Sequence, residues 1–270
     1  MVNIAEALDN IRLLDALGEE KSTVHALHPL AKLFVTLVFL IIVISFSKHE
    51  ISALLPMVLF PTIIITLADL PVLPLMKRVL IVLPLVIGIG IFNPLLDHRP
   101  MVSLGAITLS YGWISFISIM IKCLLTVITS LILIATTGMT NIALALRKLK
   151  VPKIFVLQLL LTYRYITVLM EEVILTTTAY ALRSSGIKGI HFKHWGSLLG
   201  QLLIRTIDRA QRVYTSMCCR GFDGNYNTGT MPTLVAKDYI FMLFWTLFFI
   251  ITRSFNLPML LGTILTGVYP

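Results

Sequence analysis

The sequence predicts an all-α integral membrane protein with about five or six transmembrane helices and two long amphipathic helices on the cytoplasmic side. Three observations lead to this prediction. Hydrophobic residues make up 57% of the 270 residues and charged residues only 13%, whereas soluble domains carry about 25% charged residues. Several apolar windows approach the roughly 20 residues that a helix needs to cross a bilayer. Two further segments repeat apolar residues at helical spacing beside a charged face.

The apolar windows predict membrane spans along the chain, each built as a helix because a helix satisfies its own backbone hydrogen bonds in lipid. Four windows come early, a fifth follows a long polar segment, and the last is short enough to be a half-span or a sixth short helix. The third is short but lengthens backward through Leu73. In order, the expected spans are Leu30–Phe46, Ile51–Ala68, Val79–Phe92, Trp113–Thr136, Tyr239–Ile251 and Leu257–Val268.

Charge places these segments relative to the membrane. The formal net charge is +9, and most of the excess lies between Thr136 and Asp238. The basic cluster Arg147–Lys153 flanks a predicted span, and such clusters stay in the cytoplasm. We therefore expect an N-terminal cytoplasmic segment at residues 1–27, transmembrane helices at 28–136, a cytoplasmic region at 137–236 and a C-terminal transmembrane region at 237–270. The first segment is too long and too acidic for a removed signal peptide.

The cytoplasmic region predicts two helices that end alike. One runs from Lys153 to Arg183 after Pro152, and its apolar stripe recurs every three and four residues. A second runs from about Trp195 to Arg220, and Gly221 supplies the left-handed position that ends it. Each helix thus finishes with a last-turn arginine and nearby small residues.

Charged residues on the second helix are expected to pair locally. Asp208 lies within reach of Arg205 and Arg212 at helical spacing. A terminal arginine needs no partner, because the helix dipole alone favours it by about 0.3–1 kcal/mol. Two such endings in one segment favour docking to a partner, since a fixed guanidinium matches carboxylates in a groove.

Other polar residues suggest no separate chemistry. Cys123, Cys218 and Cys219 lack the spacing of a disulfide framework or paired metal ligands. Neither the pair His25 and His28 nor the pair His191 and His194 has further converging ligands, so no metal site is predicted. The sequence contains no phosphate-binding loop of the form G-x-x-x-x-G-K-[ST]. Lys122 lies inside a predicted span, where it either faces an interface or extends to the membrane surface.

The motifs together resemble the transmembrane (T) component of energy-coupling-factor (ECF) transporters, in particular the cobalt/nickel type called CbiQ. The most specific similarity is the run GQLLIRTIDRAQRVYTSMCCRGFDG at residues 200–224. The chain departs from the family at His28, where an aspartate often precedes the proline. Weaker similarity lies at Leu27–Lys32, Leu146–Pro152, Leu161–Ile166 and Glu171–Glu172.

The resemblance implies a scaffold that couples two ABC-type ATPase subunits to a separate substrate-binding membrane subunit in a bacterial or archaeal cell membrane. ATP and magnesium would then be bound by the ATPases, with no cofactor on this chain. Two Ala-Arg-Gly-like motifs sit at the tips of the family's coupling helices, and both depart from the literal pattern here. The implied ATPase-coupling residues are Ala181, Arg183, Ser184, Gly186, Cys219, Arg220 and Gly221. The residues expected to support the coupling region are Arg164, Glu171, Glu172, Arg205, Asp208, Arg209 and Asp223.

Two alternatives remain on sequence grounds, and a third is rejected. A vitamin-type T component shares the coupling motifs, so only the partner subunit or an uptake assay separates it from a metal-type component. A membrane-embedded enzyme is less favoured, because the catalytic motifs that it needs do not appear. The basic segment lacks an aromatic stacking platform and a nucleic-acid-binding signature, which argues against a nucleic-acid partner.

Overall fold

The structure is a computed structural model that describes residues 12–13, 16–18, 20, 22–47, 50–96, 100–104, 107–184, 190–224 and 232–255. The chain divides into two compact units. We call Leu17–Gly138 with Pro232–Pro270 the bundle unit, and Met1–Ala16 with Met139–Met231 the hairpin unit. Each is described by itself.

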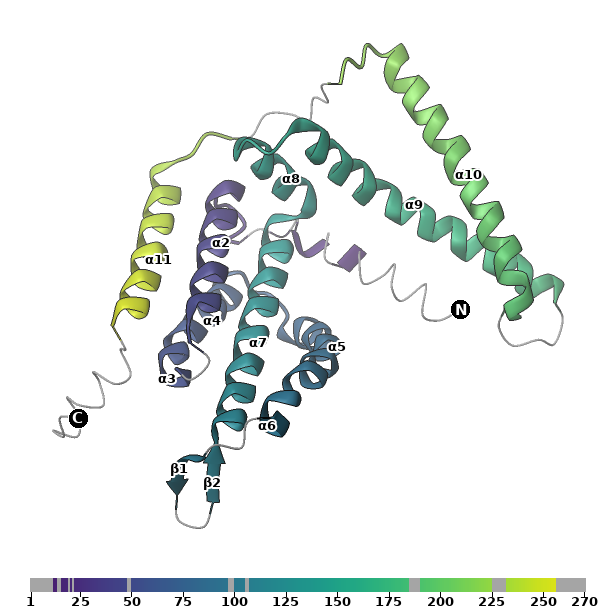
Figure 1. Cartoon of the computed structure of the whole chain (residues 1–270). Coiled ribbons are helices and arrows are strands. Elements are labelled where there is room, and N and C mark those ends of the chain that lie inside the picture. Colours follow the sequence, from purple (N-terminus) through teal and green to yellow (C-terminus); the bar gives the residue numbers. More distant parts are fainter. Residues whose placement is uncertain are drawn as a thin grey trace. The chain divides into compact units, whose positions relative to one another are not determined.

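The bundle unit is built around the long helix α7 (Tyr111–Thr137) and the helix α2 (Pro29–Ser45). Helix α2 packs against α7 and against α11 (Ala236–Ser254), while α5 (Val72–Gly90) and α6 (Phe92–Leu96) pack against α7 (Figure 1). The remaining helices of this unit are α3 (Ile51–Leu54), the 3-10 helix η1 (Leu55–Val58) and α4 (Leu59–Leu67).

Aromatic rings form the core of the bundle unit. The Phe60 ring lies 5.0 Å from that of Phe39, 5.2 Å from that of Phe249 and 4.7 Å from that of Trp245, measured between centroids. These rings come from α4, α2 and α11, and Phe39 and Phe249 are fully buried. Edge-to-face rings contribute about 0.5–1.5 kcal/mol beyond their buried area. The cluster therefore holds together helices from both ends of the chain.

The predicted spans appear as helices, with differences that have local causes. The window Ile51–Ala68 is broken into α3, η1 and α4, because Pro56 lies in the first turn of η1 and lacks an N–H donor. The third span begins at Val72, in agreement with the expected backward extension. The window Leu257–Val268 lies outside the described residues.

In the part of the chain that the structure describes, three helices are long and apolar enough to cross a membrane: Val72–Leu95, Tyr111–Thr137 and Lys153–Arg183. The apolar helices at Pro29–Ser45 and Ile51–Leu67 are shorter. The third long helix is one of the two that we expected on the cytoplasmic side. Length and composition alone thus do not distinguish such a helix from a span.

A short β-hairpin was not expected. Strand β1 (Pro100–Leu104) pairs antiparallel with β2 (Ile107–Ser110) immediately before α7. The two strands are only 5 and 4 residues long. Periodicity alone often cannot tell such short apolar runs from helical segments.

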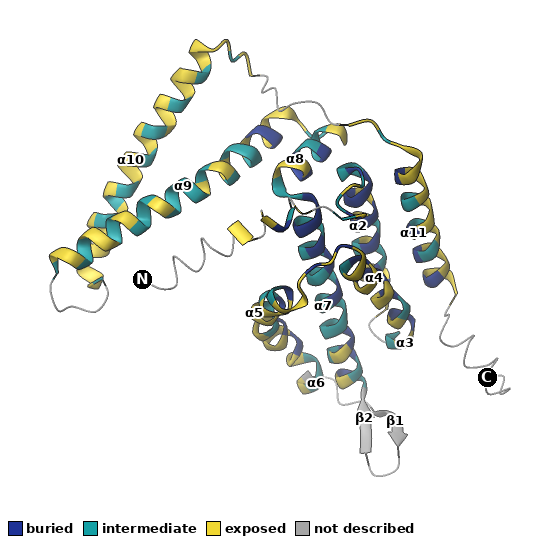
Figure 2. Cartoon of the chain, turned by 180° about the vertical axis from the view of Figure 1, so that it is seen from behind, coloured by how far each residue is buried: buried dark blue, intermediate teal, exposed yellow. Residues whose placement is uncertain are grey.

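The hairpin unit contains α8 (Met139–Lys148), α9 (Lys153–Arg183) and α10 (Phe192–Cys219). The expected bounds of α9 are confirmed, and α10 begins a few residues before the expected Trp195. Helices α9 and α10 meet where α9 ends and α10 begins, and they diverge toward the end of α10 (Figures 1 and 2). Only Val156 and Leu157 are buried in α9, and no residue is buried in α10 (Figure 2).

Candidate functional site

The end of α10 is fixed by backbone hydrogen bonds around Gly221. This glycine has a φ of +80°, which confirms the expected left-handed conformation. The N–H of Gly221 donates to the carbonyl of Cys218 at 3.0 Å, and the N–H of Phe222 donates to that of Met217 at 3.0 Å. This pair of bonds is the Schellman motif, which satisfies carbonyls that the helix end would leave without donors. Arg220 occupies the capping position and is exposed.

The end of α9 is built differently. Its last residue is Arg183, and Ser184 caps the helix. Both the N–H and the hydroxyl of Ser184 donate to the carbonyl of Tyr180, at 2.9 Å and 2.8 Å. Gly186, which the sequence analysis assigned to this ending, lies outside the described residues.

Both helix ends present their arginines to the surroundings. Arg183 is exposed beside Leu182, whose side chain is 81% exposed. Cys219 is also exposed, whereas Ala181 is partly covered. Arg183 ends α9 at the junction where α10 begins, whereas Arg220 follows the far end of α10, so the two arginines belong to opposite ends of the hairpin.

An ion pair joins the two helices near their middle. The guanidinium of Arg205 on α10 lies 2.6 Å from the carboxylate of Glu172 on α9. The expected pairing of Asp208 with Arg205 is therefore wrong, because the carboxylate on the neighbouring helix takes this arginine. Glu171 pairs with Arg12 at 2.8 Å. The Arg12–Glu171 pair is largely exposed, whereas Glu172 is 26% exposed. Exposed ion pairs contribute at most about 1 kcal/mol.

A basic groove opens between the diverging parts of α9 and α10. It has a volume of about 570 Å³ and contains Arg164 from α9 together with Arg209, Arg212 and Arg220 from α10. Arg164 and Arg209, both expected to support the coupling region, line this groove together. Their convergence was not foreseen, because spacing along one helix does not reveal which face of another helix lies opposite. Asp223, beyond the end of α10, is exposed.

A buried polar network joins α2 to α11 in the bundle unit. The carboxylate of Asp238 accepts the backbone N–H of His28 at 2.8 Å and that of Val235 at 2.9 Å. The imidazole of His28 accepts the N–H of Leu30 at 3.0 Å through Nδ1, so Nε2 carries the proton toward the carbonyl of Pro232, 3.0 Å away. His28 thus caps α2, a role suited to the aspartate that often precedes this proline in the resembled family.

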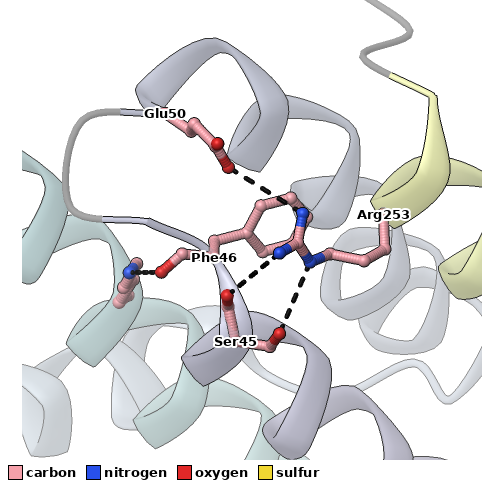
Figure 3. Close-up of polar contacts among 5 residues, drawn as sticks. Ser45, Phe46, Glu50 and Arg253 are labelled. Carbon is pink, nitrogen blue, oxygen red and sulfur yellow. Dashed lines mark hydrogen bonds and ion pairs between the residues drawn. The ribbon is translucent and has the colours of Figure 1, made fainter.

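Another polar cluster surrounds the end of α2 (Figure 3). The guanidinium of Arg253 lies 3.9 Å from the Glu50 carboxylate, 3.3 Å from the Ser45 carbonyl oxygen and 5.1 Å from the centroid of the Phe46 ring. The ammonium of Lys122 donates to the carbonyl of Phe46 at 2.6 Å. Lys122 thus contacts the residue that follows α2 within the bundle unit.

Within the described residues, no three histidine, cysteine or acidic side chains gather closely enough to hold a metal ion. The rings of His191 and His194 lie 6.3 Å apart, and His194 lies 5.9 Å from the ring of Tyr180. The contacts of these histidines are thus edge-to-face or tilted ring contacts next to the α9–α10 junction.

Comparison with known proteins gives one family and several relatives. The model of the CbiQ family, described as cobalt transport protein, matches residues 20–233. An uncharacterized protein of Methanocaldococcus jannaschii is 26% identical over 225 residues, which cover 78% of this chain and 75% of the relative. The nickel permease LarQ of Lactiplantibacillus plantarum is 26% identical over 117 residues, or 42% of this chain and 43% of LarQ. A second uncharacterized M. jannaschii protein is 30% identical over 138 residues, or 48% of this chain and 51% of the relative.

Proposed function

The chain belongs to the CbiQ family of cobalt transport proteins, and on this premise we propose that it is the multi-pass T component of an ECF-type importer for cobalt or nickel. In this role it carries motion from two ATPase subunits to a separate membrane subunit that binds the substrate. The similarity to a nickel permease supports a divalent metal as the cargo of the complex.

The observation that carries this proposal is the pair of exposed arginines at the ends of α9 and α10.

Helix α10 has no buried residue along its 28 positions. Large apolar side chains on it remain exposed, among them Leu203 at 60% and Tyr214 at 63%. Helical stability in proteins comes mainly from packing of an apolar face. A helix of this kind therefore requires cover from lipid or from other subunits.

The proposed mechanism uses each helix end as a fixed contact point. Each guanidinium, Arg183 on α9 and Arg220 on α10, enters a groove of one ATPase subunit and meets carboxylates there. The backbone bonds around Gly221 and Ser184 hold these ends in place, so that movement of the ATPases is passed to the helices. ATP and magnesium are bound by the ATPase subunits in this scheme.

Reconstitution tests the proposal. The full chain, its ATPase subunits and its substrate-binding subunit are placed in liposomes, and ATP-dependent cobalt and nickel uptake is measured. Arg183→Glu or Arg220→Glu is expected to lower uptake about tenfold or more, since a lost charged hydrogen bond costs about 1.5–3 kcal/mol. Lys193→Glu makes the same charge change at an exposed position in the first turn of α10 and should preserve uptake. Normal uptake by the double variant, with normal assembly, would overturn the proposal.

A further inference from the structure

Four arginines line the basic groove of the hairpin unit: Arg164, Arg209, Arg212 and Arg220. Among the described residues, no aspartate or glutamate is part of its lining. The ion pairs of this unit in the described residues use Arg12 and Arg205 instead. Unpaired guanidinium groups gathered in one groove favour an anionic ligand, because their planar forks match phosphate oxygens in pairs.

An apolar groove continues directly from the basic one. It has a volume of about 490 Å³, and its lining includes Leu157 and Leu169 from α9 and Ala210 from α10. The two grooves share six lining residues, so they form one continuous surface: Leu161, Tyr165, Arg209, Val213, Met217 and Phe222. A ligand that fills both parts must carry an anionic group next to hydrocarbon.

The surroundings of the groove select among ligands with this chemistry. Helix α9, which forms one wall, is long enough and apolar enough to cross the hydrocarbon core of a membrane. The aromatic rings of Tyr165 and Tyr214 line the apolar part, and tyrosine is enriched at the level of lipid head groups. Basic pockets beside membrane helices bind anionic head groups.

We propose that the groove between α9 and α10 binds one anionic phospholipid. Its phosphate is held by Arg164, Arg209 and Arg212, and one acyl chain lies along the apolar part past Ala210. Arg220 remains at the helix end for the ATPase contact, so the site does not depend on the proposed coupling function. Such a lipid would supply part of the cover that the exposed apolar side chains of α10 require.

Lipid binding is measured on the full-length protein, purified with any attached subunits in an uncharged detergent. Mixed micelles supply phosphatidylglycerol or phosphatidylcholine, and native mass spectrometry counts the lipids that remain bound. We expect one phosphatidylglycerol to be retained in preference to phosphatidylcholine. The double variant Arg209→Gln, Arg212→Gln should bind phosphatidylglycerol about tenfold more weakly. Lys193→Gln removes one charge from the same helix outside the groove and should leave binding unchanged.

A second variant keeps every charge and tests the apolar part. Ala210→Phe fills the groove where the acyl chain is placed, and it should weaken retention of phosphatidylglycerol. In a separate experiment inorganic phosphate replaces the lipid, and Ala210→Phe should leave phosphate binding unchanged. If the groove binds phosphate alone, and Ala210→Phe has no effect on binding, the assignment to a lipid is overturned. Circular dichroism checks that each variant is folded, and Ala210→Phe carries the test if the arginine variant is not.

Two outcomes would contradict the proposal directly. One is equal retention of phosphatidylglycerol by the wild type, the arginine variant and Ala210→Phe. The other is loss of a protein subunit from the arginine variant while lipid retention is unchanged, which would assign the groove to an acidic protein surface.

Discussion

Single residues decide how the chain leaves its helices. Gly221, Lys150 and Asp69 each follow a helix with positive φ, at +80°, +64° and +51°. Around Lys150, the N–H of Val151 donates to the carbonyl of Leu146 at 3.2 Å, which repeats the bond made after α10. A side chain in this conformation costs about 1–2 kcal/mol. The end of α10 avoids that cost because its residue is glycine.

Replacing Gly221 should therefore weaken the helix end that carries Arg220. A Cβ at this position meets no atom within 4 Å, so the cost comes from the backbone conformation alone. We expect Gly221→Ala to lower the free energy of opening of the last turn by about 1–2 kcal/mol. Hydrogen exchange at the Gly221 and Phe222 amides, or proteolysis of this turn, measures it.

Gly200 provides the matched control. It lies inside α10, and a Cβ there likewise meets nothing within 4 Å. Gly200→Ala should stabilise the helix by about 0.5–1 kcal/mol. If both substitutions shift exchange in the same direction, positive φ is not what matters at Gly221.

At the residue scale, the sequence predicts contacts between residues close together in the chain but not contacts between different helices. The cap at Gly221 was predictable, because glycine after an amphipathic run is a local signal. The partner of Arg205 was not, because Glu172 lies on another helix and spacing within α10 offered Asp208 instead. For the same reason the sequence did not reveal the convergence of Arg164 with the arginines of α10.

At the scale of elements, one buried carboxylate joins α2 to α11. Asp238 is only 4% exposed, and its two oxygens accept backbone N–H groups before each helix. A buried donor left without an acceptor costs about 1–3 kcal/mol. The junction of these two helices thus depends on this side chain.

Asp238→Ala should leave both donors unsatisfied and lower the free energy of unfolding by about 2–5 kcal/mol. Asp238→Asn keeps one acceptor oxygen and should cost less, and Lys237→Ala, at the exposed neighbour, should change little. Thermal unfolding in detergent ranks the three variants. Equal stability of Asp238→Ala and Lys237→Ala would contradict this role.

Element boundaries followed from the sequence where proline or glycine marks them. The start of α9 after Pro152 was predicted correctly, because proline suits the beginning of a helix but not its interior. The hairpin of β1 and β2 was missed. Its strands are short and lie between two spans, where no periodicity distinguishes a strand from the neighbouring apolar helices.

At the scale of the whole molecule, the two units differ in how much they bury. In α7 the buried residues include Leu125, Ile132 and Ala135, whereas α10 has none. Regions with few buried contacts open most easily. We therefore expect the hairpin unit to become fully ordered only when lipid or other subunits cover it.

Hydrogen exchange should separate the units in the isolated full-length protein in detergent. We expect the amides of α10 to exchange at least about tenfold faster than those of α7. Addition of the ATPase subunits should slow exchange in the last turns of α9 and α10 if these ends are the contact points. Slow exchange throughout α10 in the isolated protein would contradict the expectation.

The link between His28 and Asp238 has a consequence for how the protein is made. These residues are 210 positions apart in the chain, and the larger part of the hairpin unit, Met139–Met231, is synthesised between them. Long-range pairs of this kind form late. While the ribosome is still translating, α2 must wait in the membrane without the Phe249 ring that packs 5.3 Å from Phe39, until α11 is inserted. Nascent chains that stop before Asp238 should accordingly be substrates for chaperones and membrane proteases.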